Sequence, residues 1–367
     1  MNEERYMEMA LELAEKGAGF VSPNPLVGAV VVKDGRIIGA GYHKACGQPH
    51  AERNALADCR ESPRGADLYV TLEPCCHYGK TPPCTEAILQ SKIARVFIGS
   101  TDPNPLVSGK GIKTLRDHGV EVVTGILKER CDKMNEVFNH YIRTRTPYVV
   151  MKYAMTLDGK TAAVSGASKW ITSEEARHYV HECRHRYSAV MTGVGTVLAD
   201  DPMLNCRIQD SRNPVRIICD TNLRTPLNSQ IVLSAETIPT ILACCRQDPE
   251  KEATYRNHGI KIIHTARKNA HVDLCDLMKQ LGEMEMDSIF MESGAELNWS
   301  ALESGIVNKV HAYIAPKIFG GAGAKTPVGG VGVQLPDQAY FLDQMSVRQF
   351  EDDWMIEGEV KPCLPES

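Results

Sequence analysis

The most informative part of this sequence is a pair of motifs, His50-Ala51-Glu52 and Glu73-Pro74-Cys75-Cys76-His77-Tyr78-Gly79-Lys80-Thr81-Pro82-Pro83-Cys84. It combines a histidine, a nearby carboxylate and two well-placed cysteines. Zinc takes nitrogen and sulfur ligands, and a catalytic site uses three protein ligands and keeps the fourth position open. A carboxylate beside such a site suits proton transfer. The pattern predicts a zinc-dependent hydrolytic deaminase, with two alternatives open: Cys76 replacing Cys75, and His77 as a competing ligand.

The composition is that of an ordinary globular protein. The length of 367 residues exceeds what one core usually organises, so two domains are expected. The net charge of −5 argues against a broad nucleic-acid-binding face, which needs a basic stripe. No apolar run reaches the length of a membrane span, and the N-terminus lacks the apolar region of a signal peptide. The 13 cysteines, an odd number, favour a reducing compartment, and we expect a cytoplasmic protein.

Strand and helix patterns alternate along the whole chain. In the first part a helix, a hairpin with Asp34-Gly35 at its turn and further strands and helices predict one sheet covered on both faces. Residues 128–143 read as one long helix, and residues 231–233 as a short strand. Cys84 opens a predicted helix, whose positive N-terminus is expected to lower the thiol pKa. A polar break at residues 143–147 predicts domains at 1–145 and 146–367.

The first part resembles the deaminase domain of the bifunctional riboflavin-biosynthesis deaminase/reductase family. The shared motifs are Asn24-Pro25-x-Val27-Gly28, Gly41-Tyr42-His43, His50-Ala51-Glu52, the run from Thr71 to Cys84, and Asp102-Pro103-Asn104-Pro105. The resemblance implies a cytidine-deaminase-like three-layer α/β fold. It also implies one Zn²⁺ per chain on His50, Cys75 and Cys84, with Glu52 as the catalytic proton shuttle. The substrate contacts that it implies are Asn24, His43, His77, Lys80 and Asn104.

The second part has no GxGxxG fingerprint between a strand and a helix. Residues 291–297, Met-Glu-Ser-Gly-Ala-Glu-Leu, instead predict a strand that ends in glycine directly before a helix. Such a turn offers free backbone N–H groups to a phosphate, although the pattern fits a turn without a ligand equally well.

The second part also resembles the reductase domain of the same family. The shared motifs are residues 151–160, 170–173, 193–202 and 292–294. The resemblance implies a dihydrofolate-reductase-like fold that uses NADPH, with Lys152 and Asp200 polarising or protonating the reacting sugar. The implied cofactor contacts are Ala154, Trp170, Thr196, Asp200, Thr221, Gly294, Ala295, Glu296, Leu297, Asn298, Trp299 and Ser300. The implied sugar-phosphate contacts are Ser168, Arg184, Leu204, Arg207 and Glu292, and guanidinium forks suit phosphate.

Both domains together imply a bifunctional enzyme of riboflavin biosynthesis. It would deaminate a phosphoribosylated diaminopyrimidinone and then reduce its ribosyl group to ribityl with NADPH. The implied partner is this small molecule, without nucleic acid or membrane, and a homo-oligomer is expected. Three alternatives remain: a tRNA or nucleic-acid deaminase with an appended domain, a free-nucleotide deaminase fused to an unrelated reductase, and a structural zinc module with four protein ligands.

Overall fold

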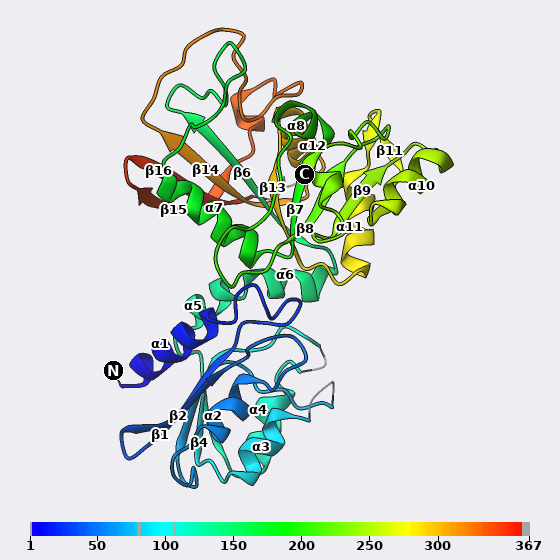
Figure 1. Ribbon diagram of the computed structural model, residues 1–367. Helices are drawn as coiled ribbons and strands as arrows, with labels where there is room; N and C mark the ends of the chain where they lie inside the picture. Colours follow the sequence, from blue (N-terminus) through cyan, green and yellow to red (C-terminus); the bar gives the residue numbers. More distant parts are fainter. Residues whose placement is uncertain (1, 79–81, 106, 362–367) are drawn as a thin grey trace. The chain divides into compact units, whose positions relative to one another are not determined.

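The chain forms two compact units, Met1–Arg145 and Thr146–Ser367, each built around its own sheet (Figure 1). The computed structural model describes residues 2–78, 82–105 and 107–361. Each unit buries apolar side chains on both faces of its sheet, so each has its own hydrophobic core. None of the described helices is long and apolar enough to cross a membrane.

The first unit contains a five-stranded sheet in the order β2-β1-β3-β4-β5. Its strands are β1 (Gly28–Lys33), β2 (Arg36–Tyr42), β3 (Asp67–Leu72), β4 (Arg95–Ser100) and β5 (Glu121–Thr124). Strand β1 runs antiparallel to β2 and β3, whereas β3, β4 and β5 are parallel. The predicted hairpin is confirmed: Asp34 and Gly35 have φ values of 48° and 73°, as the tight turn between twisted strands requires.

Helices cover both faces of this sheet, which confirms the predicted three-layer fold. One layer holds α1 (Asn2–Glu15) and α5 (Lys128–Met134), which is followed by α6 (Glu136–Thr144). The other layer holds α2 (Ala51–Ala57), α3 (Cys84–Gln90) and α4 (Lys110–Asp117). Alternate strand residues separate the two cores, because successive side chains point to opposite faces. Val30, Tyr69 and Phe97 pack with α1 and α5, and Ala29, Leu68 and Ile98 with α2 to α4.

The prediction of one long helix over residues 128–143 was wrong at Asn135, where the structure separates α5 from α6. The buried Asn135 side chain bonds the backbone of Leu26 twice: its Oδ1 accepts from the Leu26 N–H at 2.8 Å, and its Nδ2 donates to the Leu26 carbonyl at 2.9 Å. This contact spans 109 residues of sequence, so local helical periodicity could not reveal it.

The second unit contains a nine-stranded sheet in the order β10-β9-β8-β7-β13-β6-β14-β16-β15. Neighbouring strands from β10 to β14 are parallel, and β16 and β15 continue the sheet antiparallel. Its strands are β6 (Tyr148–Thr156), β7 (Ala189–Gly193), β8 (Val215–Cys219), β9 (Thr240–Cys244), β10 (Ile260–His264), β13 (Ser288–Glu292), β14 (Val307–Ala315), β15 (Leu342–Phe350) and β16 (Asp353–Val360). A small hairpin joins β11 (Arg267–Lys268) to β12 (His271–Val272).

Helices again lie on both faces of the second sheet. One face packs against α11 (Leu274–Glu283) and α12 (Ala295–Glu303), and the other against α7 (Glu174–Arg186), α8 (Val194–Asp200), α9 (Gln230–Leu233) and α10 (Pro249–Asn257). A 3₁₀ turn covers Pro336–Gln338. The predicted strand at residues 231–233 was wrong, because Ile231 and Val232 turn into α9 and fill the core below it. Three apolar residues are too few to show a period.

Candidate metal centre and reductase site

Three predicted ligands meet beyond the carboxyl end of β3, although they come from separate segments. His50 is the N-cap of α2, Cys75 lies in the loop after β3, and Cys84 is the first residue of α3. The His50 Nδ1 lies 3.5 Å from the Cys75 Sγ and 3.4 Å from the Cys84 Sγ. A tetrahedral zinc ion with ordinary bond lengths separates nitrogen and sulfur ligands by roughly 3.5 Å. The three side chains therefore fit a zinc ion.

The pKa values of the two thiols shift in opposite directions. The pKa of Cys75 is lowered, first because the Cys84 thiol donates a hydrogen bond to its sulfur, and the Cys84 backbone N–H also donates, at 3.3 Å. The pKa of Cys84 is raised, because its proton is held by Cys75 and because the side chain is buried. Pairing with Cys75 and burial are thus the largest influences on the pKa of Cys84, and the effect expected from the helix N-terminus stays a prediction.

Cys76 and His77 lie beside the predicted ligands. Among the residues that the structure describes, the side chains that converge as a metal-binding group are His50, Cys75 and Cys84. Cys76 is half-buried, and burial raises the pKa of its thiol. The His77 side chain is exposed, and its charge acts on Asp102. The geometry thus favours Cys75 over Cys76 as the sulfur ligand.

Glu52 is buried next to this group. Only 3% of the residue is exposed, and burial raises the pKa of its carboxyl group. The carboxyl group also contacts the Cys84 side chain by a hydrogen bond. A carboxyl group held at the edge of three metal-binding atoms is placed to accept and return a proton there.

The predicted substrate contacts of the first unit fall into two places. The Asn24 Nδ2 lies 3.1 Å from the His43 Nε2, and the His43 ring meets the His50 ring edge-on at 5.3 Å. Burial lowers the pKa of His43, which favours a neutral imidazole. Asn104 lies in the loop after β4, where its backbone N–H donates to Asp102 at 2.8 Å. The structure therefore brings Asn24 and His43 to the metal-binding group, while Lys80 lies outside the described residues.

Sequence reasoning missed two residues that hold this arrangement together. Arg53, next to Glu52 on α2, donates to the carbonyls of Pro82 at 3.2 Å and Pro83 at 3.0 Å, directly before Cys84. Glu73, directly before Pro74, accepts backbone N–H groups from another segment. Glu73 lies inside the quoted run from Thr71 to Cys84 and Arg53 directly follows Glu52, but residue type alone does not reveal their partners.

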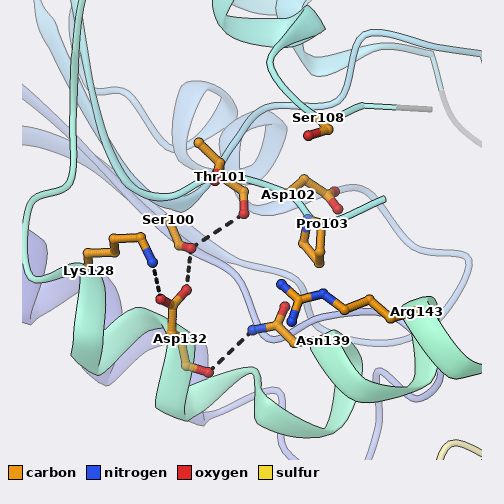
Figure 2. A pocket seen from close by; sticks show the side chains of 9 residues that line it. All are labelled: Ser100, Thr101, Asp102, Pro103, Ser108, Lys128, Asp132, Asn139 and Arg143. Carbon is orange, nitrogen blue, oxygen red and sulfur yellow. Dashed lines mark hydrogen bonds and ion pairs between the residues drawn. The ribbon is translucent and has the colours of Figure 1, made fainter. Parts of the chain in front are cut away.

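A polar cavity of about 440 Å³ lies near the end of β4 (Figure 2). At its wall Asp132 accepts hydrogen bonds from Ser100 and from Lys128, and the Asn139 amide donates to the Asp132 carbonyl at 3.4 Å. Asp102 also lines it, and burial raises the pKa of this carboxyl to about 6. The cavity thus borders the loop that carries Asn104 without containing the metal-binding group.

In the second unit, Lys152, Glu292 and Arg184 form one buried charged cluster. Lys152 on β6 is the register partner of Glu292, the last residue of β13. Arg184 on α7 donates to both carboxylate oxygens of Glu292, at 2.6 and 2.9 Å. Burial lowers the pKa of Lys152, and the negative charge of Glu292 partly offsets that effect. The structure thus brings together three of the residues predicted to act on the sugar.

Two further buried polar atoms belong to residues near this cluster. The Tyr313 hydroxyl and the His181 Nδ1 are buried and lack a hydrogen-bond partner among the described residues. The Lys152 Nζ lies 5.5 Å from the centre of the Tyr313 ring. Buried polar atoms are normally paired, so these two indicate a place for water or a bound molecule.

Some of the predicted cofactor contacts, Thr196 and residues 294–297, lie at the starts of two helices. Gly294 is the N-cap of α12 and gives no side-chain cap, so the first N–H groups of this helix are available to an anion. A methyl group built on Gly294 would lie 3.8 Å from the Thr196 Oγ1 of α8. These features fit the diphosphate of a dinucleotide. Asn298 differs from its helix neighbours because its fully buried side chain bonds Ser293 and Pro327.

The other predicted contacts of the second unit lie on several separate elements. The exposed Trp170 ring is stacked under the Arg177 guanidinium group at 4.5 Å. Leu204 is buried, whereas Arg207 is exposed and donates to Asn205 at 3.4 Å. The remaining positions are Ala154 in β6, Ser168 in an exposed loop, Asp200 at the end of α8, Thr221 after β8, and Ala295, Glu296, Leu297, Trp299 and Ser300 in α12.

Family comparisons match the two units separately. Residues 1–100 match the cytidine and deoxycytidylate deaminase zinc-binding region. Residues 147–356 match the RibD C-terminal domain. The first match contains every member of the metal-binding group, and the second contains Lys152, Arg184 and Glu292.

Whole-chain comparisons find proteins with the same two parts. The riboflavin biosynthesis protein RibD of Actinobacillus pleuropneumoniae is 54% identical over 352 residues, which cover 96% of this chain and 94% of that protein. A solved structure of RibD from Acinetobacter baumannii has a TM-score of 0.87 at 34% identity and covers 98% of this chain and 99% of its own. A Thermotoga maritima structure, described as a diaminohydroxyphosphoribosylaminopyrimidine deaminase/5-amino-6-(5-phosphoribosylamino)uracil reductase, has a TM-score of 0.84 at 39% identity, with 98% and 99% coverage.

Proposed function

Because the chain belongs to the RibD family, the bifunctional deaminase/reductases of riboflavin biosynthesis, we propose that its first unit deaminates a phosphoribosylated diaminopyrimidine and its second reduces the ribosyl group of the product. The observation that carries the proposal is the His50, Cys75 and Cys84 group beside the buried Glu52. The substrates would be those named for the Thermotoga maritima relative.

One zinc ion per chain would be held by His50, Cys75 and Cys84. When bound, zinc lowers the pKa of a coordinated water to about 7 and so supplies a nucleophile at neutral pH. Glu52 would accept the proton of the attacking water and return protons to the ring nitrogen and to the departing amine. Asn24 and His43, which bond each other beside His50, would orient the pyrimidine.

In the second unit, the N–H groups that begin α12 would bind NADPH, with Thr196 beside them. The cofactor supplies hydride, and the protein binds, orients and polarises the sugar. Lys152 would polarise or protonate the reacting sugar, with Glu292 as its neighbour on β13 and Arg184 bound to Glu292. Arg207, which is exposed, would meet the phosphate.

The remaining parts of the proposal concern partners and location. We propose a homo-oligomer that works in the cytoplasm on small molecules, without nucleic acid or membrane as partner. The net charge of −5 supports the absence of a nucleic-acid face. Sedimentation of the purified chain, and titration with RNA at low salt, test these two points.

The decisive experiment follows both reactions in one sample. The full chain is incubated with the diaminopyrimidine ribotide, zinc and NADPH while ammonia and NADPH absorbance are recorded. The proposal expects ammonia release first and NADPH consumption second. Glu52→Gln should retain zinc and lose ammonia release, yet reduce the deaminated pyrimidine at the normal rate. Normal ammonia release by this variant would contradict the role of Glu52.

A further inference from the structure

The Glu73 side chain joins two segments of the first unit. Only 3% of this residue is exposed. Both of its carboxylate oxygens accept backbone N–H groups. One oxygen accepts from Gly111 at 3.0 Å and Ile112 at 3.2 Å, in the first turn of α4. The other accepts from Gly109 at 3.0 Å and Asp102 at 3.4 Å. One carboxylate therefore ties the start of α4 to the loop after β4.

These contacts need a carboxylate with two equivalent acceptor oxygens. The first N–H groups of a helix have no partner inside the helix, and negative charge near that end is favourable. Gly111 allows the close approach, because a methyl group there would come within 2.2 Å of the Pro74 carbonyl oxygen and 3.2 Å of the Glu73 Oε1. The helix start and the Glu73-Pro74 segment are thus packed backbone against backbone.

On its other side, Glu73 is two residues from the sulfur ligand Cys75. The Glu73 N–H donates to the Ser100 carbonyl at 2.9 Å, which continues the contact with β4. The Cys75 carbonyl accepts from the Thr85 N–H at 3.2 Å and from the Thr85 hydroxyl at 3.3 Å. The Cys75 backbone is consequently held between α3 on one side and the Glu73 contacts on the other.

The loop that Glu73 holds at Asp102 and Gly109 also carries Asn104. Asp102 accepts the Asn104 N–H at 2.8 Å, and the Asn104 carbonyl accepts from Val107 at 2.8 Å and Ser108 at 2.9 Å. Asn104 is thus bonded to Asp102 on one side and to Val107 and Ser108 on the other. Movement of the Cys75 segment would be transmitted to the residues around Asn104 through the Glu73 side chain.

We propose that Glu73 is a positioning residue that couples the metal-binding loop, residues 73–77, to the Asn104 loop, residues 102–105 and 107–109. Zinc binding at Cys75 then orders the Asn104 loop, and a bound pyrimidine in turn tightens the metal-binding loop. The proposal rests on the proposed function for the identity of the metal and for the contact between Asn104 and the pyrimidine.

Glu73→Gln tests the coupling at nearly constant volume. The amide keeps one acceptor oxygen but turns an NH₂ group toward two backbone N–H donors, so half of the contacts are lost. The probe is zinc alone, added to the metal-depleted full chain, with hydrogen exchange measured on peptides that cover residues 102–112. In the natural chain zinc should slow exchange there by about tenfold or more. In Glu73→Gln zinc should still bind, by metal analysis, but should slow exchange by less than about twofold.

A matched control is Asp58→Asn in the same unit. The Asp58 carboxylate accepts a backbone N–H from Ala40 at 3.0 Å, and this side-chain bond is to β2, not to the described part of the Asn104 loop. It should keep the full zinc-dependent protection. Equal protection in Glu73→Gln and the natural chain would overturn the proposal, as would equal loss in Asp58→Asn. If Glu73→Gln does not fold, Glu73→Asp, which keeps the charge but shortens the reach, should show a reduced protection by zinc; full protection overturns the coupling.

A kinetic measurement separates coupling from general loosening. Glu73→Gln should raise the KM for the pyrimidine by about tenfold, with a smaller fall in kcat and an unchanged reductase rate in the same chain. An unchanged KM with a lower kcat would overturn the link to Asn104. If the natural chain releases no ammonia, the proposed function fails, while the zinc-dependent exchange still decides the coupling.

Discussion

Arg184 and Glu292 form a two-point ion pair inside the second unit, although 108 residues separate them in the sequence. The Nε and Nη2 atoms of Arg184 donate to the two carboxylate oxygens at 2.6 and 2.9 Å, and its Nη1 donates to the Asn205 carbonyl at 2.9 Å. The two side chains are only 12% and 13% exposed. The fork of Arg184 is thus engaged by the protein, and its first effect is to hold Glu292 beside Lys152.

Arg184→Lys should therefore damage the second unit although it keeps the charge. A single ammonium cannot bind both carboxylate oxygens, and a poorly paired buried charge costs about 3–5 kcal/mol. Denaturation followed by tryptophan fluorescence measures this unit alone, because Trp170, Trp299 and Trp354 all lie in it.

The same change at an exposed pair supplies the control. Arg256 pairs with Glu252 one helical turn away, and its side chain is 53% exposed. Arg256→Lys should change the free energy of unfolding by less than about 1 kcal/mol. Equal effects of the two substitutions would contradict the importance of the two-point geometry at Glu292.

Lys152 should set the alkaline limit of the reductase. Burial lowers the pKa of Lys152 from its ordinary value of 10.5, so the ammonium form is lost at a lower pH than usual. If the ammonium form reacts, kcat/KM should fall tenfold per pH unit above that lowered pKa. Lys152→Met should lose about 100-fold or more in rate and lose this pH dependence as well. A pH profile with saturating NADPH measures both, and ammonia release serves as the unaffected reaction.

Asp102 should make the first unit less stable at neutral than at acidic pH. Burial raises the pKa of Asp102 from 3.8 to about 6. Below pH 3.8 the Asp102 carboxyl group is protonated in both the folded and the unfolded chain. Between 3.8 and about 6 the unfolded chain ionises first, so the free energy of unfolding falls, by about 3 kcal/mol at most.

Asp102→Asn should remove this dependence. At pH 7 the variant should unfold at a higher temperature than the natural chain, and at pH 4 this advantage should vanish. Calorimetry at equal zinc content checks the prediction, since tryptophan fluorescence does not report on this unit. A natural chain that gains stability between pH 4 and 7 relative to the variant would show that the sign is wrong.

Arg216 should be a structural requirement of the second unit. It is fully buried, and its donors reach Thr240, Ser234 and the carbonyls of Met203, Ile231 and Ile238. Burial lowers its pKa to about 10, which still leaves it charged at neutral pH. Arg216→Met removes the donors to all three carbonyls, and among the described residues only the Ile238 carbonyl keeps another one, the Thr240 hydroxyl at 2.9 Å. Two carbonyls lose their Arg216 donor at about 1–3 kcal/mol each, so the loss should be at least about 2 kcal/mol.

Urea denaturation followed by tryptophan fluorescence measures that loss. The exposed Arg267, whose guanidinium reaches Asn222 at 3.4 Å, gives a control in the same unit. Arg267→Met should stay within about 0.5 kcal/mol of the natural chain. A loss at Arg216 as small as this would mean that the carbonyls find water.

The sequence predicted the metal-binding group well because its chemistry is local. His50 and Glu52 lie one residue apart, and Cys84 opens the helix that follows the Cys75 loop, so short-range patterns place them. Short spacing does not set the pKa of Cys84. It depends on burial and on a second thiol, which the residue order does not describe.

Two elements were predicted wrongly because tertiary contacts, which residue order does not describe, decide them. The helix break at Asn135 comes from a partner 109 residues away, and α9 forms where residues 231 and 232 meet the core. Helical periodicity and β-propensity describe neighbours along the chain, and tertiary contacts override them at such points.

By itself, the sequence predicted the two α/β domains and a His/Cys/Cys group beside a carboxylate, because these depend on residue type and short spacing. The two activities followed from the resemblance of its motifs to a known family. The tertiary structure alone decided that Glu73 binds the start of α4, that Arg184 holds Glu292, and that Arg216 is buried among carbonyls. Each of those contacts joins segments that are distant in the chain. Their partners are selected by the packing of the whole unit, which brings donors and acceptors together only after the sheet and its helices have formed.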